Sequence, residues 1–218
     1  MERESSAREK RDLSAAEFGY NFSRITSFLK SCRMLPRAII LPGNGCTPVE
    51  DCNWYSWMQA QLTRSGKFSE VVLRDMPDPY EAKEEIWIPF IKSEMKVDEN
   101  TIVIGHSSGA VAAMRLLEHT AALGCVLVST CHTDLGCESE RISNYYSRPW
   151  QWDKIKSNAS WILQYHSEDD YLIPIGEADY VAENIESEYT RYPNRSHFFE
   201  PRDVKEITEQ IIMKINHS

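Results

Sequence analysis

Short apolar runs alternate along the chain with longer segments in which apolar residues recur at helical spacing. A short, continuous apolar run is typical of a strand that is buried on both faces. We therefore predict strands over residues 37–41, 71–73, 101–104, 124–129, 161–165 and 188–192. Helices are predicted over residues 53–63, 80–95, 108–119, 176–184 and 202–216. Pro89 should kink or divide the second of these helices, because proline cannot donate a backbone hydrogen bond.

This alternation of strands and helices predicts an α/β fold. Strands buried on both faces indicate a mostly parallel sheet of about six strands between two layers of helices, a three-layer sandwich. Ligands of such sheets bind beyond the carboxyl ends of the strands. We assign residues 37–218 to this single domain. Residues 1–36 are rich in charge of both signs, and we expect them to form a flexible extension.

Composition and charge exclude several classes of protein. The chain has 218 residues and a net charge of −9, without a Lys/Arg stripe, so nucleic acid is not an expected partner. No apolar run is long enough to cross a bilayer. The six cysteines lack metal-ligand spacing, so no metal is expected. Without a secretory signal we expect a cytoplasmic or nuclear protein with reduced thiols, and targeting to an organelle by residues 1–36 stays open.

The chemistry is concentrated at residues 105–109, which match the pattern G-x-S-x-G. An apolar strand precedes the pattern and a helix of small residues follows it, which is the context of a nucleophile elbow. Ser107 is then the nucleophile, and side chains at Gly105 and Gly109 would collide with the tight turn. Ser108 is the alternative nucleophile. Its backbone N–H, at the start of the helix, is a predicted oxyanion donor.

A serine nucleophile needs a base and an orienting carboxylate, which in this fold class follow in the order Ser, Asp, His. Of the six histidines, His197 lies after the last predicted strand and before the last helix, where the base belongs. Residues 168–170 follow the strand at 161–165 and offer three carboxylates, of which Asp170 and Asp169 are the candidates. The N–H of Asn44, in the loop after the first strand, is the second predicted oxyanion donor, although a plain turn explains that loop almost equally well.

Several ordered blocks of sequence resemble one family. They are PGNG at 42–45, MPDP at 76–79, IWIPF at 86–90, IGHSSGAVAAMR at 104–115, TDLG at 133–136, RPWQW at 148–152, EDDYLIP at 168–174 and SH at 196–197. Together they make the chain similar to the small serine hydrolases of the retinoblastoma-binding protein 9 type, from about residue 37 to the C-terminus. The resemblance implies an α/β-hydrolase core without a large cap domain, and a triad of Ser107, Asp170 and His197. The Asp-x-x-apolar-Pro spacing of the superfamily selects Asp170 over Asp169.

The resemblance also suggests that Trp54, Trp150 and Trp152 wall an acyl pocket, although ordinary packing explains these residues equally well. Some members of the family carry an L-x-C-x-E motif that pocket proteins recognise. Here residues 95–99 read MKVDE, so a retinoblastoma-type partner is not carried over. The Cys-Gly-His context of the family's base is Arg-Ser-His at 195–197, which keeps the histidine and changes its loop.

These residues predict a serine hydrolase that cleaves a small or medium ester or amide through an acyl-enzyme, without a cofactor. The expected partner is therefore a small-molecule substrate. The alternative is a hydrolase-fold protein that acts as a protein-binding module with little catalysis, because a fold does not guarantee its activity.

Overall fold

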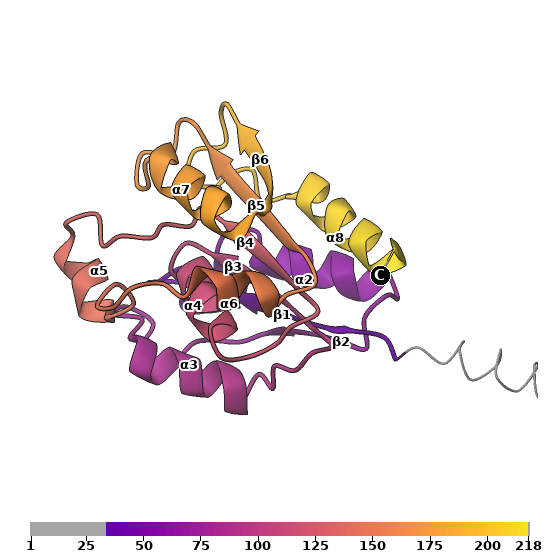
Figure 1. Ribbon diagram of the computed structural model, residues 1–218. Helices are drawn as coiled ribbons and strands as arrows, with labels where there is room; N and C mark the ends of the chain where they lie inside the picture. Colours follow the sequence, from indigo (N-terminus) through magenta and orange to yellow (C-terminus); the bar gives the residue numbers. More distant parts are fainter. Residues whose placement is uncertain (1–33, 218) are drawn as a thin grey trace, which may run out of the picture. The chain divides into compact units, whose positions relative to one another are not determined.

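The computed structural model describes residues 34–217, and in this part of the chain strands and helices alternate (Figure 1). The strands are β1 (Arg37–Leu41), β2 (Glu70–Leu73), β3 (Thr101–His106), β4 (Gly124–Val128), β5 (Ile162–Ser167) and β6 (Glu188–Tyr192). The helices are η1 (Val49–Asp51), α2 (Tyr55–Arg64), α3 (Glu84–Ser93), α4 (Ser108–Leu117), α5 (Glu138–Ser143), α6 (Trp152–Ser157), α7 (Ile175–Ile185) and α8 (Lys205–His217). The extension predicted over residues 1–36 lies almost wholly outside the described residues and stays a prediction.

The six strands form one sheet in the order β2-β1-β3-β4-β5-β6, and all five neighbouring pairs are parallel. The predicted sheet is thus confirmed, and it is more uniformly parallel than expected. After β1 the chain passes to β2 on one side and then crosses back to β3 on the other side. Such a reversal of direction opens a crevice beyond the carboxyl ends of the two central strands. The loops that follow β1 and β3 therefore border this crevice.

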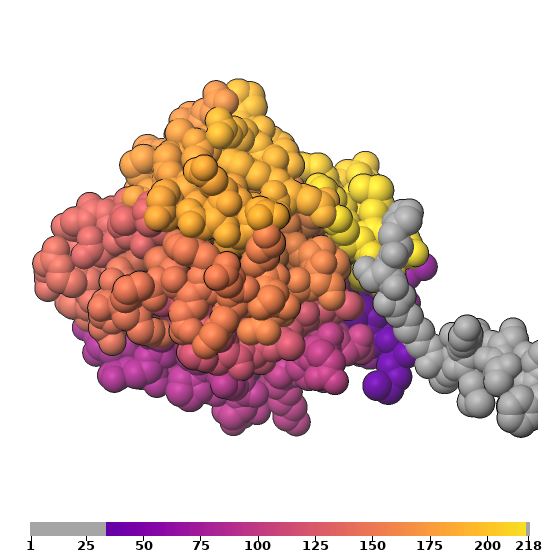
Figure 2. Space-filling view, in the orientation of Figure 1, coloured from indigo at the N-terminus to yellow at the C-terminus, as the bar shows by residue number. Residues whose placement is uncertain are grey.

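Helices cover both faces of the sheet and bury two separate apolar clusters. Side chains of α2 and α8 pack on one face, and those of α3, α4, α6 and α7 pack on the other (Figure 1). Figure 2 shows in the same orientation that atoms fill the gaps left between the ribbons of Figure 1. Strands β1 to β5 supply residues to both clusters from opposite faces of the sheet, for example Ile39 to one and Ile40 to the other. The three-layer sandwich is confirmed, and no cap domain is found in the described chain.

Two local features differ from the sequence prediction. The helix predicted over residues 80–95 begins only at Glu84, and it continues through Pro89 to Ser93 without a division. Proline costs this helix a single backbone hydrogen bond, because its missing N–H would have bonded to the carbonyl four residues earlier. The short helices η1, α5 and α6 were not predicted. They have three, six and six residues, which is too short for a helical repeat of apolar positions to stand out.

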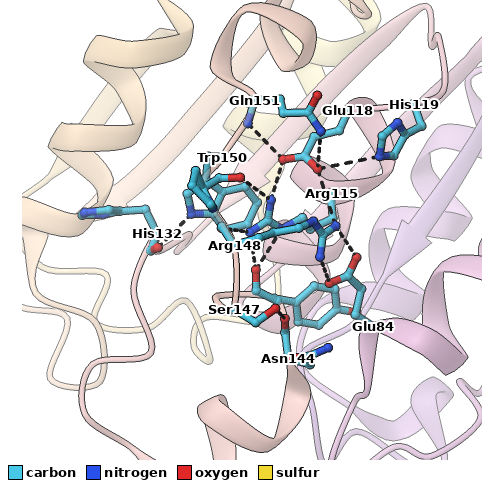
Figure 3. A network of polar contacts seen from close by, with 12 residues as sticks. Glu84, Arg115, Glu118, His119, His132, Asn144, Ser147, Arg148, Trp150 and Gln151 are labelled. Atoms are coloured by element: carbon cyan, nitrogen blue, oxygen red, sulfur yellow. Dashed lines mark hydrogen bonds and ion pairs between the residues drawn. The ribbon is translucent and has the colours of Figure 1, made fainter.

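Arg115 is a charged residue within the buried helix α4. Its Nη1 lies 2.5 Å from Oε1 of Glu118, and neither side chain has exposed surface. The guanidinium also donates to the backbone carbonyls of Tyr145 and Arg148, and it stacks 3.6 Å above the centre of the Trp150 ring (Figure 3). These hydrogen bonds attach the segment before α6 to α4. The residues that precede this segment in the chain border the crevice.

We expect Arg115→Met to lower the free energy of unfolding by about 3–5 kcal/mol, because it leaves the Glu118 carboxylate buried without its main counter-charge. Urea denaturation would measure this loss. Arg141→Met is the matched control, since Arg141 forms an exposed pair with Glu138 and should cost about 1 kcal/mol or less. Equal losses in the two variants would contradict the role of the buried network.

Candidate active site

Ser107 occupies a strained turn between β3 and α4. Its φ of 55° and ψ of −123° are rare for a residue with a side chain, and its N–H donates to the carbonyl of Val128 at 2.9 Å. A Cβ atom on Gly105 would lie 2.4 Å from the carbonyl oxygen of Gly109, and one on Gly109 would lie 2.2 Å from the carbonyl oxygen of Leu41. Both glycines are therefore required by backbone contacts on either side of the serine.

Two residues with unpartnered backbone amides lie beside this turn. Asn44 and Ser108 line one cavity with Ser107, and within residues 34–217 neither of their N–H groups has a hydrogen-bond partner. Ser108 is the first residue of α4, where free amides and the helix dipole favour negative charge. Asn44 follows β1, the neighbour of β3, and a Cβ on Gly43 would lie only 3.3 Å from that of Ser107. The structure thus brings the two predicted oxyanion donors to the serine.

The side chains of His197 and Asp170 form a buried pair. Nδ1 of His197 lies 2.8 Å from Oδ2 and 3.1 Å from Oδ1 of the carboxylate, and the two residues are 2% and 8% exposed. Burial alone would raise the pKa of Asp170. The hydrogen bond and charge of His197 and the N–H groups of Ile173 and Leu172 outweigh burial and lower the pKa. The ionised carboxylate therefore holds the proton on Nδ1 and leaves Nε2 with a lone pair.

Asp169, the other candidate acid, has different partners. Its Oδ1 accepts the Ser167 hydroxyl at 2.5 Å and the Ser196 N–H at 2.8 Å. The Ser167 hydrogen bond lowers the pKa of this carboxyl group. Asp169 thus joins the end of β5 to the loop that carries His197, while Asp170 contacts the imidazole itself.

Ser107 and His197 line the same cavity, which has a volume of about 200 Å³. Its other lining residues are Asn44, Ser108, Cys131, Leu135, Cys137, Ser139, Glu140, Tyr146, Leu172 and Ile173. No hydrogen bond joins the Ser107 hydroxyl to Nε2 of His197, although the structure describes both residues. In unliganded enzymes this contact is often long and shortens only around a bound substrate.

The three tryptophans that were expected to wall the acyl pocket lie outside the Ser107 cavity. Trp54 is fully buried on the α2 side, where its ring packs edge-on against those of Tyr55 and His106. Trp150 and Trp152 stack on each other at 5.5 Å and line a separate surface hollow. Within the described chain none of them lines the Ser107 cavity. Trp150 is held away because its Nε1 donates to the carbonyl of His132 and its ring lies under Arg115 (Figure 3).

Sequence patterns missed the residues that do form the walls. One wall comes from the segment between β4 and α6, through Leu135, Glu140 and Tyr146, and another from Leu172 and Ile173 after β5. The blocks TDLG at 133–136 and EDDYLIP at 168–174 fall in these segments, but no role in the cavity was predicted for Leu135, Leu172 or Ile173. Within the described residues there is no group of three metal-ligating side chains, and no helix is long and apolar enough to cross a membrane.

Comparison with known proteins identifies the family. The family model named "Serine hydrolase" matches residues 38–210. The chain belongs to the serine hydrolase family. It is 44% identical over 162 residues to "Serine hydrolase RBBP9" of Rattus norvegicus, an alignment that covers 74% of this chain and 87% of that protein. The resemblance predicted from the ordered blocks is confirmed, and this serine hydrolase is an enzyme by family and not only a binding module.

Solved structures support the fold. The ydeN gene product of Bacillus subtilis superposes with a TM-score of 0.74 at 21% identity, over 83% of this chain and 99% of that one. Est1E from Butyrivibrio proteoclasticus superposes with a TM-score of 0.62 at 10% identity, over 85% of this chain and 90% of that one. At such low identity the likeness concerns the fold alone, which is that of the α/β hydrolases.

Proposed function

We propose that this serine hydrolase cleaves small or medium carboxylic esters or amides through a triad of Ser107, His197 and Asp170. The observation that carries the proposal is that the strained serine and the carboxylate-bound imidazole line one cavity. Its small volume suits a short acyl group. The two unpartnered amides of Asn44 and Ser108 lie where negative charge develops during acyl transfer.

In the first half of the reaction Oγ of Ser107 attacks the carbonyl carbon while Nε2 of His197 takes the hydroxyl proton. The carbonyl oxygen becomes an oxyanion, which accepts hydrogen bonds from the amides of Asn44 and Ser108. When this tetrahedral intermediate collapses, the bond to the alkoxide or amine breaks and His197 returns the proton to that leaving group. An acyl group then remains on Ser107.

Water completes the cycle by the same steps in reverse. His197 takes a proton from the water, whose oxygen attacks the acyl carbon and again forms an oxyanion. The bond to Ser107 then breaks, and His197 gives the proton back to Oγ as the carboxylic acid leaves. Asp170 stays ionised throughout and stabilises the imidazolium, consistent with its lowered pKa.

A fluorophosphonate probe tests the proposal, since it phosphonylates an activated serine with loss of fluoride. Trypsin releases residues 97–115 as one peptide that holds both Ser107 and Ser108. Fragmentation of this peptide should place the adduct on Ser107, and the labelled protein should lose its hydrolysis of p-nitrophenyl butyrate. An adduct on Ser108, or labelling outside this peptide, would contradict the assignment.

The charge of the cavity bears on the acyl group. Glu140 is the carboxylate among the lining residues of the described chain, and its Oε2 accepts the Tyr146 hydroxyl at 3.2 Å. Burial raises the pKa of Glu140, since that single hydrogen bond does not offset the loss of water. When ionised, this carboxylate repels a second carboxylate placed in the cavity. The site should therefore favour neutral acyl groups over anionic ones.

We expect Glu140→Gln to narrow the ratio of kcat/KM for p-nitrophenyl butyrate over p-nitrophenyl hemisuccinate by about tenfold at pH 8. Because the Glu140 pKa is raised, the wild-type ratio should also fall with decreasing pH sooner than an ordinary glutamate would predict. Glu138→Gln is the matched control, because Glu138 lies on the same helix, pairs with Arg141 and does not line the cavity. If both variants keep the wild-type ratio, Glu140 does not select against anionic acyl groups.

A further inference from the structure

His106, the residue before the nucleophile, is fully buried and uses both ring nitrogens. Nε2 lies 2.9 Å from the backbone carbonyl oxygen of His197, and Nδ1 lies 2.7 Å from the hydroxyl oxygen of Tyr55. A carbonyl oxygen can only accept, so Nε2 carries the ring proton. Nδ1 then accepts the hydrogen bond that the Tyr55 hydroxyl donates. The neighbour of the nucleophile thus holds the backbone of the base.

Tyr55 extends this connection to the other side of the site. While its hydroxyl donates to His106, it accepts the N–H of Gly43 and the Nδ2 amide of Asn53, each at 3.0 Å. All its hydrogen-bonding positions are therefore occupied. Gly43 directly precedes Asn44, the proposed oxyanion donor. A continuous chain of buried hydrogen bonds therefore runs from the loop after β1, through Tyr55 and His106, to the loop that carries His197.

We propose that Tyr55 and His106 are positioning residues. They fix the loop after β1, which carries Asn44, and the backbone of His197 in place on either side of Ser107. The inference rests on the proposed roles of Asn44, Ser107 and His197. Within the described residues, the carbonyl of His197 and the N–H of Gly43 have no other hydrogen-bond partner than these two side chains. If these hydrogen bonds are removed, the loop after β1 and the loop that carries His197 each lose a backbone hydrogen bond beside the cavity.

The protonation state of His106 keeps these hydrogen bonds unchanged over a wide pH range. Burial, assisted by repulsion from a protonated His197, lowers the pKa of His106 to about 3. The ring therefore stays neutral and keeps a single tautomer over the range in which a serine hydrolase works. The centre of its ring lies 5.0 Å from that of His197, so a charge on His106 would oppose the imidazolium that forms during catalysis.

The test compares three variants with wild type. Tyr55→Phe keeps the ring and removes the hydroxyl, so kcat for p-nitrophenyl butyrate should fall about 10- to 100-fold with little change in KM. The rate of fluorophosphonate labelling at Ser107 should fall in parallel. His106→Leu should show the same loss. His106→Gln can still donate to the His197 carbonyl, so it should recover part of the activity.

Tyr165→Phe controls for the loss of a buried tyrosine hydroxyl. Tyr165 is in the same apolar cluster as Tyr55, and it donates to Oε1 of Gln210 at 2.7 Å, away from the cavity. It should lose thermal stability and keep its kcat. If kcat in Tyr55→Phe and His106→Leu stays within twofold of wild type, or falls only as far as in Tyr165→Phe, the positioning role is wrong. Should His106→Leu not fold, Tyr55→Phe decides.

Failure of this inference differs from failure of the proposed function. If Ser107 of the wild type takes up the probe while Tyr55→Phe reacts at an unchanged rate, the triad stands and the positioning role falls. If Ser107 of the wild type is not labelled, the proposed function falls first.

Discussion

Ser107→Ala should lower kcat for p-nitrophenyl butyrate by at least about 10⁴-fold, the largest effect that we expect from any single substitution. Alanine removes the atom that forms the bond to the acyl carbon, so the covalent path is lost. The cavity and the amides of Asn44 and Ser108 remain, and they account for any residual rate over water. Steady-state kinetics, with fluorophosphonate labelling as a second readout, would measure the loss.

Ser108→Ala is the matched control for the alternative nucleophile. It keeps the backbone N–H that the mechanism uses and removes only a hydroxyl, so kcat should stay within about tenfold of wild type. Both serines line the cavity, so the pair of variants separates them by chemistry and not by access. A large loss in Ser108→Ala together with an active Ser107→Ala would reverse the assignment.

The second large effect concerns Asp170→Asn, which should lower kcat by about 10⁴-fold. The uncharged amide no longer stabilises the imidazolium of His197. It can also donate to Nδ1, which would move the ring proton to Nε2 and remove the lone pair that accepts the Ser107 proton. The pH profile of kcat would show whether activity returns at high pH, where hydroxide can replace the missing base.

Asp169→Asn is the control for this variant. Asparagine keeps the Oδ1 atom that accepts from Ser167 and Ser196, so kcat should stay within about threefold of wild type. The two substitutions are adjacent and isosteric, and they differ in which carboxylate contacts the imidazole. Loss of activity in Asp169→Asn alone would show that the contact between Asp170 and His197 is not the catalytic one.

The strands and most helices were predictable because their signals are local. Buried parallel strands leave unbroken apolar runs, and all six strands were placed within two residues of their observed ends. The residues of β6 are half-buried or exposed, so this strand lacks an unbroken apolar run, although its predicted bounds match the observed ones. The three shortest helices, η1, α5 and α6, escaped prediction because a helix of three or six residues shows no clear periodicity.

The elbow was also predictable, because its constraints fall within five residues. The glycines at 105 and 109 are dictated by contacts made as soon as the chain turns from β3 into α4. The histidine and its acid were placed only as far as chain order allows. Chain order does not separate the two adjacent carboxylates, and the Asp-x-x-apolar-Pro spacing of the resembled superfamily selected Asp170. In the structure the fold of the loop after β5 places Asp170 against His197 and Asp169 against Ser196.

The sequence by itself therefore determined the parallel sheet and the strained serine, since neighbours along the chain impose both, and it indicated the candidate triad through the residue order typical of this fold class. Only the tertiary structure decided the walls of the cavity, the position of the tryptophans and the path from Gly43 through Tyr55 and His106 to His197. No sequence pattern near Gly43 or His197 indicates that the two residues are connected. Their connection arises when the sheet sets β1 beside β3 and packing closes the loops over Ser107.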